Sequence, residues 1–530
     1  HNRYQKHQSG GNEALVLLGV VSLSSLIRLI KQEKPGLICC IFRQDKDWSS
    51  WVCSRDLQAF KNLLLQHSIV FRALPSRAMK HELFSLLRDE LFGFVGSTLL
   101  VANTSDSEVA GVVRSFYKDF LNGLRARTGG PCVDEFMMLF HTYVNYSRCN
   151  FNLLSSRDFP ESKPLIVVGS GPSLDRSLSA LRAVRGDCIV ISAGSSIGTL
   201  MRSGIHPDVH VHVERGDSGE LRSVYGGVLD ELGFVDFGDT VAVLPTSIEP
   251  ELPGLYKRVV MYGRAAQTPV IAWPAIEPSL LEYEGPECLS AAFAFAMHLC
   301  PKHVFLFGCD LGSVDGSADR SASAVGHSSR DFMLPVLGNF VQTAFTNSQM
   351  LLQLSYMKAA YSACRSSPEV FNLSDGIHLS FAQPLRLKGL RLSDLVKDAL
   401  GLNIDELYGA IAAPGLGHCA SPIGASEIAD AKHLIDQWLV LAEQAPSMSR
   451  FAVRLQASRL LSARRFRHCE LMHRIFRGSL RDAFWLTSFA LERYCQNSKD
   501  VEYCWASFSR FLQGLLLEID AMPTWLGSCD

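Results

Sequence analysis

The chain lacks any apolar run long enough to cross a bilayer, since a membrane-spanning helix needs about 20 mostly apolar residues. Its best runs are 15–21, 37–42 and 291–297. It also lacks an excess of either charge, because 51 Lys and Arg residues face 53 Asp and Glu residues and leave a net charge of −2. We therefore expect no membrane insertion. We also expect no nucleic-acid partner, since a chain with almost no net charge would need a local patch of positive charge to bind one.

Paired cysteines are also missing, although the chain of 530 residues has 15 cysteines. No CxxC spacing occurs, so the sequence predicts no structural zinc site. The polar start, residues 1–11, is unlike a signal peptide. We interpret the cysteines as reduced, mostly buried thiols and expect a cytoplasmic protein.

Apolar segments that alternate with helical patterns predict an α/β fold. The candidate strands of the middle region are 165–168, 188–192, 209–213, 241–244, 259–262, 304–307 and 370–372. Helical patterns lie between several of them, as at 174–184 and 289–299. This alternation predicts a doubly wound, Rossmann-like and mostly parallel sheet that is covered on both faces.

Three domains are expected from these patterns. The first, 1–155, is a smaller N-terminal α/β domain in which one βαβ unit at 14–42 is followed mainly by helices. The second, 156–400, holds the central sheet. The third, 401–530, is helical and follows a linker at 411–421 that is rich in glycine, alanine and proline.

The sharpest local signal is a glycine turn that follows the strand at 165–168. It reads Gly169-Ser170-Gly171-Pro172-Ser173 and precedes an amphipathic helix. Such a turn lets backbone N–H groups approach an anion at the positive end of the helix, and we expect Ser173 to cap that helix. The usual nucleotide motifs are incomplete, because Leu174 stands where GxGxxG requires glycine and no P-loop lysine follows.

Two other patterns allow alternative chemistry. Residues 194–198 match GxSxG after a candidate strand, which would make Ser196 the nucleophile of a hydrolase. Alternation also places His210, His212 and Glu214 on one face of a strand, where they are either metal ligands or ordinary polar groups at a strand end. The second interpretation is favoured, because three ligands on one straight strand suit a tetrahedral metal poorly.

Several blocks occur in an order that resembles a known family. They are 169–174 (GSGPSL), 193–196 leading through 204–208 to Glu214, 288–297, 303–312, 337–340 and 371–376. This order resembles the motility accessory factor family of bacterial flagellin glycosyltransferases. The central domain of that family is similar to 6-hydroxymethylpterin pyrophosphokinases and to bacterial sialyltransferases that use CMP-sialic acid.

The resemblance implies transfer of a nonulosonic acid, of pseudaminic or legionaminic type, from a CMP donor to Ser or Thr of flagellin. It implies no obligatory cofactor or metal. The nucleotide-sugar contacts that it implies are Gly169, Ser170, Gly171, Pro172, Ser173, Ala193, Gly194, Ser195, Glu214, Thr246, Ser290, Ser374 and Asp375. The catalytic residues that it implies are Asp310 and, as general base, His327.

One departure concerns the phosphate. The similar sialyltransferases have a phosphate-binding tyrosine after their Gly-x-Asp motif, whereas this chain has Gly312 and Ser313. In this chain the contact to the phosphate would then come from Arg320 or Arg330. Residues 310–330 are poor in apolar side chains, so we expect a mobile lid.

Other functions remain open at the level of sequence. A pterin pyrophosphokinase would share the central domain but need ATP and Mg²⁺, and a flagellin-binding assembly factor would lack activity. Nine arginines and one acid lie between Arg450 and Arg481. They indicate either the solvated face of a helix or a docking surface for a protein partner.

Overall fold

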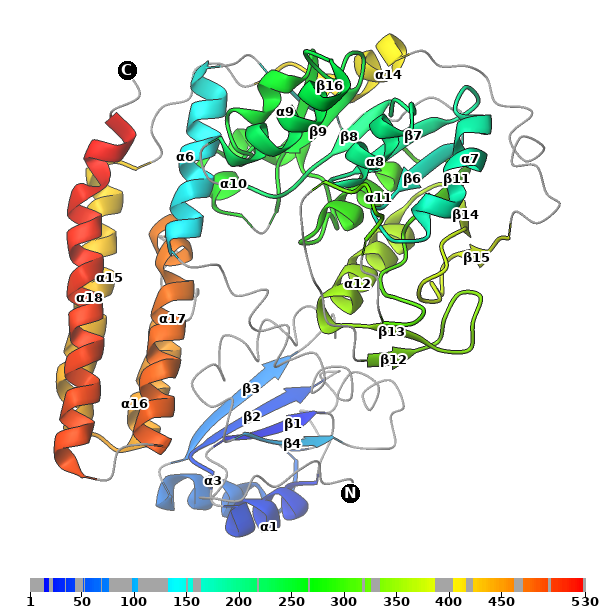
Figure 1. Ribbon diagram of the computed structural model, residues 1–530. Coiled ribbons are helices and arrows are strands. Elements are labelled where there is room, and N and C mark those ends of the chain that lie inside the picture. The colour runs from blue at the N-terminus through cyan, green and yellow to red at the C-terminus, as the bar shows by residue number, and fades with distance from the viewer. Residues whose placement is uncertain are drawn as a thin grey trace. The chain divides into compact units, whose positions relative to one another are not determined.

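The computed structural model describes residues 14–18, 22–33, 35–42, 51, 53–67, 69–75, 98–102, 132–148, 151–155, 164–216, 219–265, 267–316, 320–325, 334–386, 404–415, 423–461, 470–493 and 497–527. The chain divides into two compact units (Figure 1). The central unit spans 134–422, and the second unit combines 1–133 with 423–528.

The central unit is built on a ten-stranded sheet of order β15-β14-β11-β6-β7-β8-β9-β10-β5-β16. Its strands are β5 (Asn152–Leu154), β6 (Leu165–Val168), β7 (Ile189–Ala193), β8 (Val209–Val211), β9 (Val241–Pro245), β10 (Arg258–Tyr262), β11 (His303–Phe307), β14 (Glu369–Asn372), β15 (Gln383–Pro384) and β16 (Ala412–Ala413). All neighbours pair in parallel except β16, which runs antiparallel to β5. The predicted fold class is confirmed.

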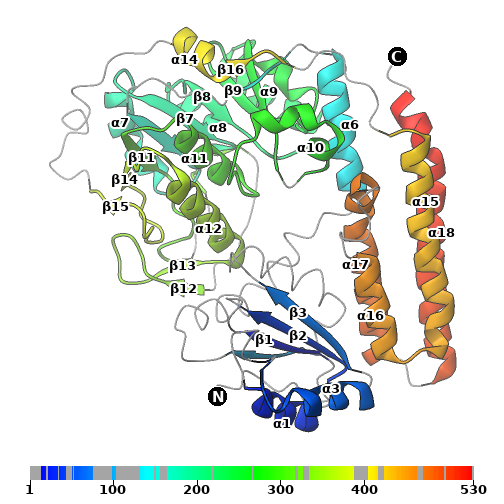
Figure 2. The same cartoon turned by 180° about the vertical axis from the view of Figure 1, so that it is seen from behind.

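Helices cover both faces of this sheet, which explains its runs of consecutive apolar residues. Val167 and Ile191 pack in one core with α11 (Cys288–His298) and α12 (Ser348–Ala363). Ile166 and Val190 point the other way, into a core with α7 (Leu174–Val184) and α8 (Ser196–Arg202). Figure 2 shows the same layers from behind.

The unit contains several further elements. They are α6 (Cys132–Arg148), α9 (Glu220–Leu232), α10 (Thr268–Ala272), α14 (Ile404–Ile411), the 3₁₀ helices η2 (Leu252–Leu255) and η3 (Pro274–Ser279), and an antiparallel pair of strands, β12 (Leu334–Val336) and β13 (Ala344–Thr346).

The order of strands places a topological switch point beside β6. From β6 the chain builds the sheet outward through β7 to β10, and it then returns to place β11 on the other side of β6. In open α/β sheets the carboxyl ends of the strands at such a point are where ligands bind. The turns that follow β6, β7 and β11 all lie at this edge.

The central unit extends further along the chain than the sequence patterns suggest. Residues 134–155 and 404–415 contribute α6, β5, α14 and β16. The expected linker at 411–421 begins inside this sheet, since Ser155 N donates to Ile411 O at 2.7 Å and β16 pairs with β5. Strands of two or three residues carry too few positions for a recognisable pattern.

The N-terminal part of the second unit contains a parallel sheet of order β3-β2-β1-β4. Its elements are β1 (Ala14–Leu18), α1 (Leu23–Glu33), β2 (Leu37–Phe42), α3 (Leu57–Gln66), β3 (Val70–Pro75) and β4 (Thr98–Ala102). The predicted βαβ unit is present. The expectation of mainly helices after it was wrong for β3 and β4, which are strands because each pairs with a distant strand.

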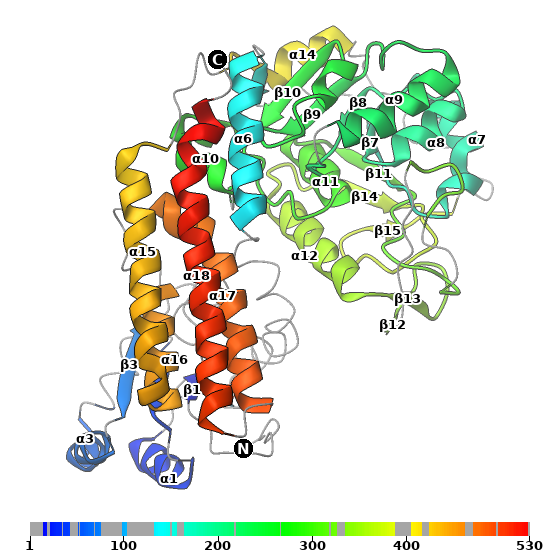
Figure 3. The ribbon, with the colours of Figure 1, turned by 60° about the vertical axis from the view of Figure 1, so that its left-hand side comes forward.

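The C-terminal part of this unit is helical, as expected. Its elements are α15 (Ala425–Gln444), η4 (Ala445–Ser447), α16 (Arg450–Leu461), α17 (Glu470–Arg493) and α18 (Ser498–Gly527). Helices α15 and α18 lie side by side (Figure 3). Arg477 and Arg481 on α17 are only 4% and 3% exposed, so these two arginines do not belong to a solvated face. No helix within the described ranges has the length and apolar character needed to cross a membrane.

Candidate functional site

The turns after β6 and β11 are joined backbone to backbone at the switch point. Gly169 N donates to Phe307 O, and Gly171 N donates to Gly308 O, each at 2.8 Å. A Cβ atom on Gly169 would lie 2.5 Å from Gly308 O, and Gly308 has a φ of +60°. Glycine is therefore required at both positions by the close approach of two backbones.

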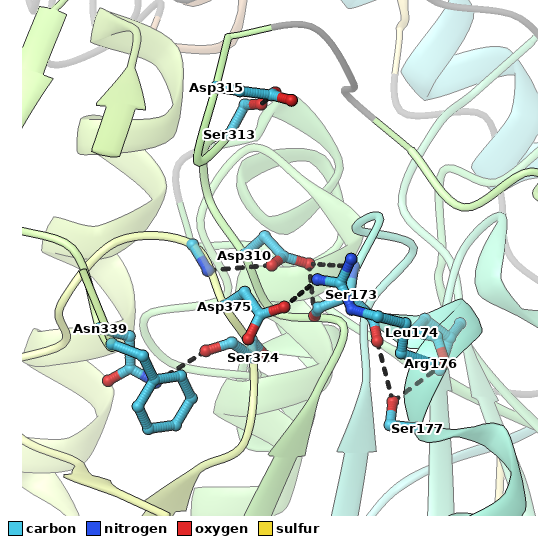
Figure 4. Close-up of polar contacts among 12 residues, drawn as sticks. Ser173, Leu174, Arg176, Ser177, Asp310, Ser313, Asp315, Asn339, Ser374 and Asp375 are labelled. Atoms are coloured by element: carbon cyan, nitrogen blue, oxygen red, sulfur yellow. Dashed lines mark hydrogen bonds and ion pairs between the residues drawn. The ribbon is translucent and has the colours of Figure 1, made fainter. Parts of the chain in front are cut away.

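Asp310 holds this junction together (Figure 4). Its Oδ2 accepts hydrogen bonds from Ser173 N at 3.2 Å and Ser173 Oγ at 2.8 Å, and its Oδ1 accepts one from Gly376 N at 3.0 Å. A Cβ atom on Gly171 or Gly376 would collide with Asp310. The carboxylate thus joins three turns, those after β6, β11 and β14.

The positive end of α7 is consequently occupied by a carboxylate of the chain itself. Ser173 does not cap the helix with its side chain, as the sequence suggested, because its hydroxyl donates to Asp310 instead. Asp310 is 3% exposed, and burial raises its pKa from 3.8 to about 6 despite the hydrogen bonds from Ser173 and Gly376 that lower it.

Ser374 and Asp375 follow β14 at the same edge, but their contacts differ. Ser374 is fully buried and its Oγ accepts a hydrogen bond from Cys309 N at 2.7 Å. Asn339 Nδ2 donates to Ser374 O at 2.7 Å. Asp375 is partly exposed and forms an ion pair with Arg176 on α7. The structure brings both residues beside Asp310, where Ser374 orders the backbone and Asp375 faces outward.

The second predicted turn, after β7, also lies at this edge. Gly194 has a φ of +49°, and its N–H donates to Val211 O at 2.8 Å. Ala193 is buried, whereas Ser195 is partly exposed. Ser196 is fully buried, and its Oγ donates to Val168 O at 2.9 Å while accepting from Ala193 N at 3.1 Å. The hydrolase interpretation is wrong, because this hydroxyl cannot reach a substrate.

Two histidines at the end of β8, His210 within the strand and His212 just after it, are buried polar groups. His210 hydrogen-bonds through Nε2 to Gly194 O at 3.1 Å and through Nδ1 to the hydroxyl of Tyr256. The hydroxyl oxygen of Tyr225 lies within hydrogen-bond distance of His212 Nδ1, at 3.1 Å. Burial lowers the pKa of His210 to about 4 and that of His212 to about 3, so both rings are neutral near pH 7.

Glu214 is not part of this buried cluster, because it is exposed while both histidines are buried. Among the residues that the structure describes, no three His, Cys, Asp or Glu side chains converge in a way that could hold a metal ion. Burial of both histidines and their hydrogen bonds to Tyr256 and Tyr225 fit the second interpretation, polar groups at a strand end.

Part of the expected lid is anchored. Residues 320–325 run over the two turns, where Ser321 N donates to Ser170 O at 2.8 Å and Val325 N donates to Ser195 O at 3.2 Å. Val325 is 8% exposed and packs beside Gly198. This apolar anchor was not recognised within a polar segment. His327 and Arg330 lie outside the described residues.

Two predicted contacts, Thr246 and Ser290, have mainly structural partners. Thr246 is buried after β9, and its carbonyl oxygen accepts a hydrogen bond from Asn145 Nδ2 of α6 at 2.9 Å. Ser290 is buried at the start of α11, where its Oγ accepts from Glu287 N at 3.4 Å and donates to Glu287 O at 2.8 Å. The Pro172 position is partly exposed at the first turn.

A second group of charges, which the sequence patterns did not predict, lies at the carboxyl ends of β8 and β10. Arg264 forms a buried ion pair with Glu284 at 3.1 Å, and Arg215 pairs with Asp134 of α6 at 2.6 Å. The sequence does contain a signal for this group, because Arg264 lies two residues after the apolar end of β10 at Tyr262. A charge at that position is typical of the ligand-binding edge of a parallel sheet.

Comparison with known proteins agrees with this architecture. Residues 138–316 match the MptE-like family, described as 6-hydroxymethylpterin diphosphokinase MptE-like, and this range includes both turns and Asp310. The solved structure of the Maf glycosyltransferase from Magnetospirillum magneticum AMB-1 is similar over 100% of this chain and 82% of its own length, with a TM-score of 0.71 and 18% sequence identity. The chain has the fold of a Maf glycosyltransferase.

The resemblance expected from the ordered motifs is confirmed by these two findings. The family match begins before the expected central domain, 156–400, and covers only its first part. No curated protein shows a significant match to the chain.

Proposed function

We propose that this protein is a glycosyltransferase that moves a nonulosonic acid from a CMP-activated donor to Ser or Thr of flagellin in the cytoplasm. The fold that it shares with a Maf glycosyltransferase over its whole length supports the reaction class. The observation that carries the proposal is the arrangement of two glycine turns at one switch point, bridged by residues 320–325 through Ser170 O and Ser195 O.

The chemistry has two requirements at this edge. The departing CMP carries an anionic phosphate, which positive charge and backbone N–H groups stabilise. The acceptor hydroxyl must lose its proton as the new bond forms, and His327 is the residue proposed to take it. No metal ion is required for either step.

Asp310 has a different role from His327 in this proposal. Its two carboxylate oxygens already accept hydrogen bonds from Ser173 and Gly376, and it is almost fully buried. A base must reach the proton that it removes. We therefore assign Asp310 to holding the nucleotide turns in place rather than to proton transfer.

The decisive experiment compares the intact mass of flagellin made with and without this protein in cells that produce a CMP-nonulosonic acid. Flagellin should gain the mass of one or more nonulosonic acid residues only when the protein is present. Calorimetry should show binding of CMP without Mg²⁺. Unmodified flagellin together with absent CMP binding would reject the proposal, whereas flagellin binding without CMP binding would indicate a non-catalytic assembly factor.

A second candidate function is a pterin diphosphokinase, which the match of residues 138–316 favours. That reaction needs ATP, Mg²⁺ and a hydroxymethylpterin, and it releases AMP. Incubating the protein with these three compounds separates the two proposals, because a glycosyltransferase should release no AMP from them.

A further inference from the structure

Residues 320–325, here called the strap, are attached to the rest of the site at both turns. The backbone bonds to Ser170 O and Ser195 O fix the strap across the carboxyl ends of β6 and β7. Ser321 is 5% exposed, so this part of the chain is packed rather than lying loosely on the surface. Its position is therefore set by the same two turns that the proposed function assigns to the nucleotide.

Side chains on α7 and α8 fasten the strap further. Asp175, in the first turn of α7, accepts hydrogen bonds from Ser321 Oγ and, at 3.0 Å, from Ala322 N. Ser321 Oγ also lies 3.0 Å from Thr199 Oγ1 on α8. Arg202 Nη1 donates to Ser323 O at 2.9 Å and is itself held by Glu231. Among the described residues, Asp175 is the only one of these side chains that binds two successive residues of the strap, Ser321 and Ala322.

Arg320 is the first residue of the strap and lies against its last residue. Its Nη1 donates to Val325 O at 3.2 Å, which folds the side chain back along the strap. Burial raises the pKa of Tyr225, the partner of His212, and the Arg320 guanidinium acts in the opposite direction. Arg320 thus spans the strap, since its neighbour Ser321 is bound to the first turn at Ser170 O and its guanidinium reaches Val325, which is bound to the second turn at Ser195 O.

Arg320 also differs from the other arginines at this edge. Arg176, Arg215 and Arg264 form ion pairs with Asp375, Asp134 and Glu284. Within the described part of the chain, no carboxylate lies within ion-pair distance of Arg320, whose side chain is partly exposed. Its charge is available for an anion.

An anion at this edge needs such a cation. The N-terminus of α7 would ordinarily attract a phosphate, but the carboxylate of Asp310 already accepts the N–H of Ser173 there. A second anion close to this carboxylate would be repelled unless a positive charge compensates. An arginine suits the task, because its guanidinium donates several hydrogen bonds to phosphate oxygens.

We propose that Arg320 binds the phosphate of the nucleotide donor, and that Asp175 is the positioning residue that holds Arg320 in place through Ser321 and Ala322. This inference rests on the proposed function, since it takes the donor to be a nucleotide. It adds the phosphate ligand and the residue that orients it.

Binding of CMP and of cytidine, measured by calorimetry on the full-length protein, tests this assignment. The wild type should bind CMP more tightly than cytidine. Arg320→Ala should raise the Kd of CMP about 10- to 100-fold and leave that of cytidine unchanged, because only CMP has the phosphate. Arg320→Lys should retain part of the preference. Arg182→Ala, which removes a cation in the last turn of α7, is the matched control and should change neither Kd.

Asp175 requires a test that separates positioning from folding. Asp175→Asn should reduce the preference for CMP by a smaller factor, about 3- to 10-fold, and Asp175→Glu should restore part of it. The double variant Arg320→Ala/Asp175→Asn should be no worse than Arg320→Ala alone, since Asp175 acts through Arg320.

The outcomes distinguish this inference from the proposed function. If the wild type prefers CMP and Arg320→Ala keeps that preference, or loses both ligands equally, Arg320 is not the phosphate ligand. If the wild type binds neither CMP nor cytidine, the proposed function fails and this inference fails with it.

Discussion

The hydroxyl of Ser173 donates a hydrogen bond to Oδ2 of Asp310 at 2.8 Å, and the N–H of Ser173 reaches the same oxygen at 3.2 Å. This pair ties the first turn of α7 to the end of β11. It also means that the predicted anion-binding position, the N-terminus of α7, is occupied by a carboxylate of the protein itself. The energetic coupling of these two residues is open to direct measurement.

Ser173→Ala should lower the free energy of unfolding by about 1–3 kcal/mol, because a buried hydrogen bond to a carboxylate is lost. Asp310→Asn should cost at least as much, since the amide nitrogen cannot accept from Ser173 or Gly376. The double variant should cost less than the sum of the two. Urea denaturation measures all three values, and strict additivity would show that the residues are not coupled.

The pH dependence of stability should report on Asp310. Its pKa is raised from 3.8 to about 6 in the folded protein, so the folded state binds the proton more tightly than the unfolded state. The stabilisation is fully present below pH 4 and is lost as the pH rises through 6. Relative to Asp310→Asn, which does not titrate, the wild type should lose roughly 2 kcal/mol between pH 4 and pH 7, because the carboxyl group of the unfolded chain is already mostly ionised at pH 4.

This comparison of urea denaturation curves removes the titration of all other groups, which both proteins share. A difference in unfolding free energy that stays constant from pH 4 to pH 7 would mean that the carboxyl group of Asp310 titrates normally.

Gly171→Ala should destabilise the protein by about 1–3 kcal/mol or more, because its Cβ would collide with Asp310 Oδ2 and Gly308 O. Gly186→Ala is the control, since a Cβ at Gly186 meets nothing within 4 Å. Thermal unfolding should show a lower Tm for the first variant and a nearly unchanged Tm for the second. An unaffected Gly171→Ala protein would contradict the tight junction of the two turns.

Ser196→Ala should reduce stability by about 1 kcal/mol, the usual value of one buried hydrogen bond, and leave sugar transfer unchanged. The reason is that Ser196 Oγ is committed to Val168 O and Ala193 N. Flagellin modification in the folded variant is the readout. Loss of activity without loss of stability would revive a nucleophilic role for this serine.

His327→Ala should lower the rate of flagellin glycosylation by about 10²–10⁴-fold and leave the Kd of CMP nearly unchanged, since general base catalysis contributes a factor of that size. His303→Ala is a suitable control, because His303 begins β11 at the amino edge and pairs with Glu369 at 3.2 Å. Normal transfer by His327→Ala would move the search for the base to other residues.

Much of the fold could be predicted from local patterns. Segments such as 165–168 and 303–307 are apolar at every central position, and a strand that is covered on both faces leaves no place for a polar residue. The helices between them follow from periodicity. Short edge strands such as β16 could not be predicted, because two residues show no period and the pairing partner, β5, is far away in the chain.

The sequence by itself determined that a glycine turn, a small-residue turn and an aspartate would follow three buried strands of one sheet. Only the tertiary structure decided what each of them contacts. Ser173 and Asp310 are 137 positions apart, and they meet because β6 and β11 are parallel neighbours across a crossover. Which strands become neighbours depends on the packing of the whole sheet, and for that reason no local pattern could show that a carboxylate, rather than a ligand, occupies the start of α7.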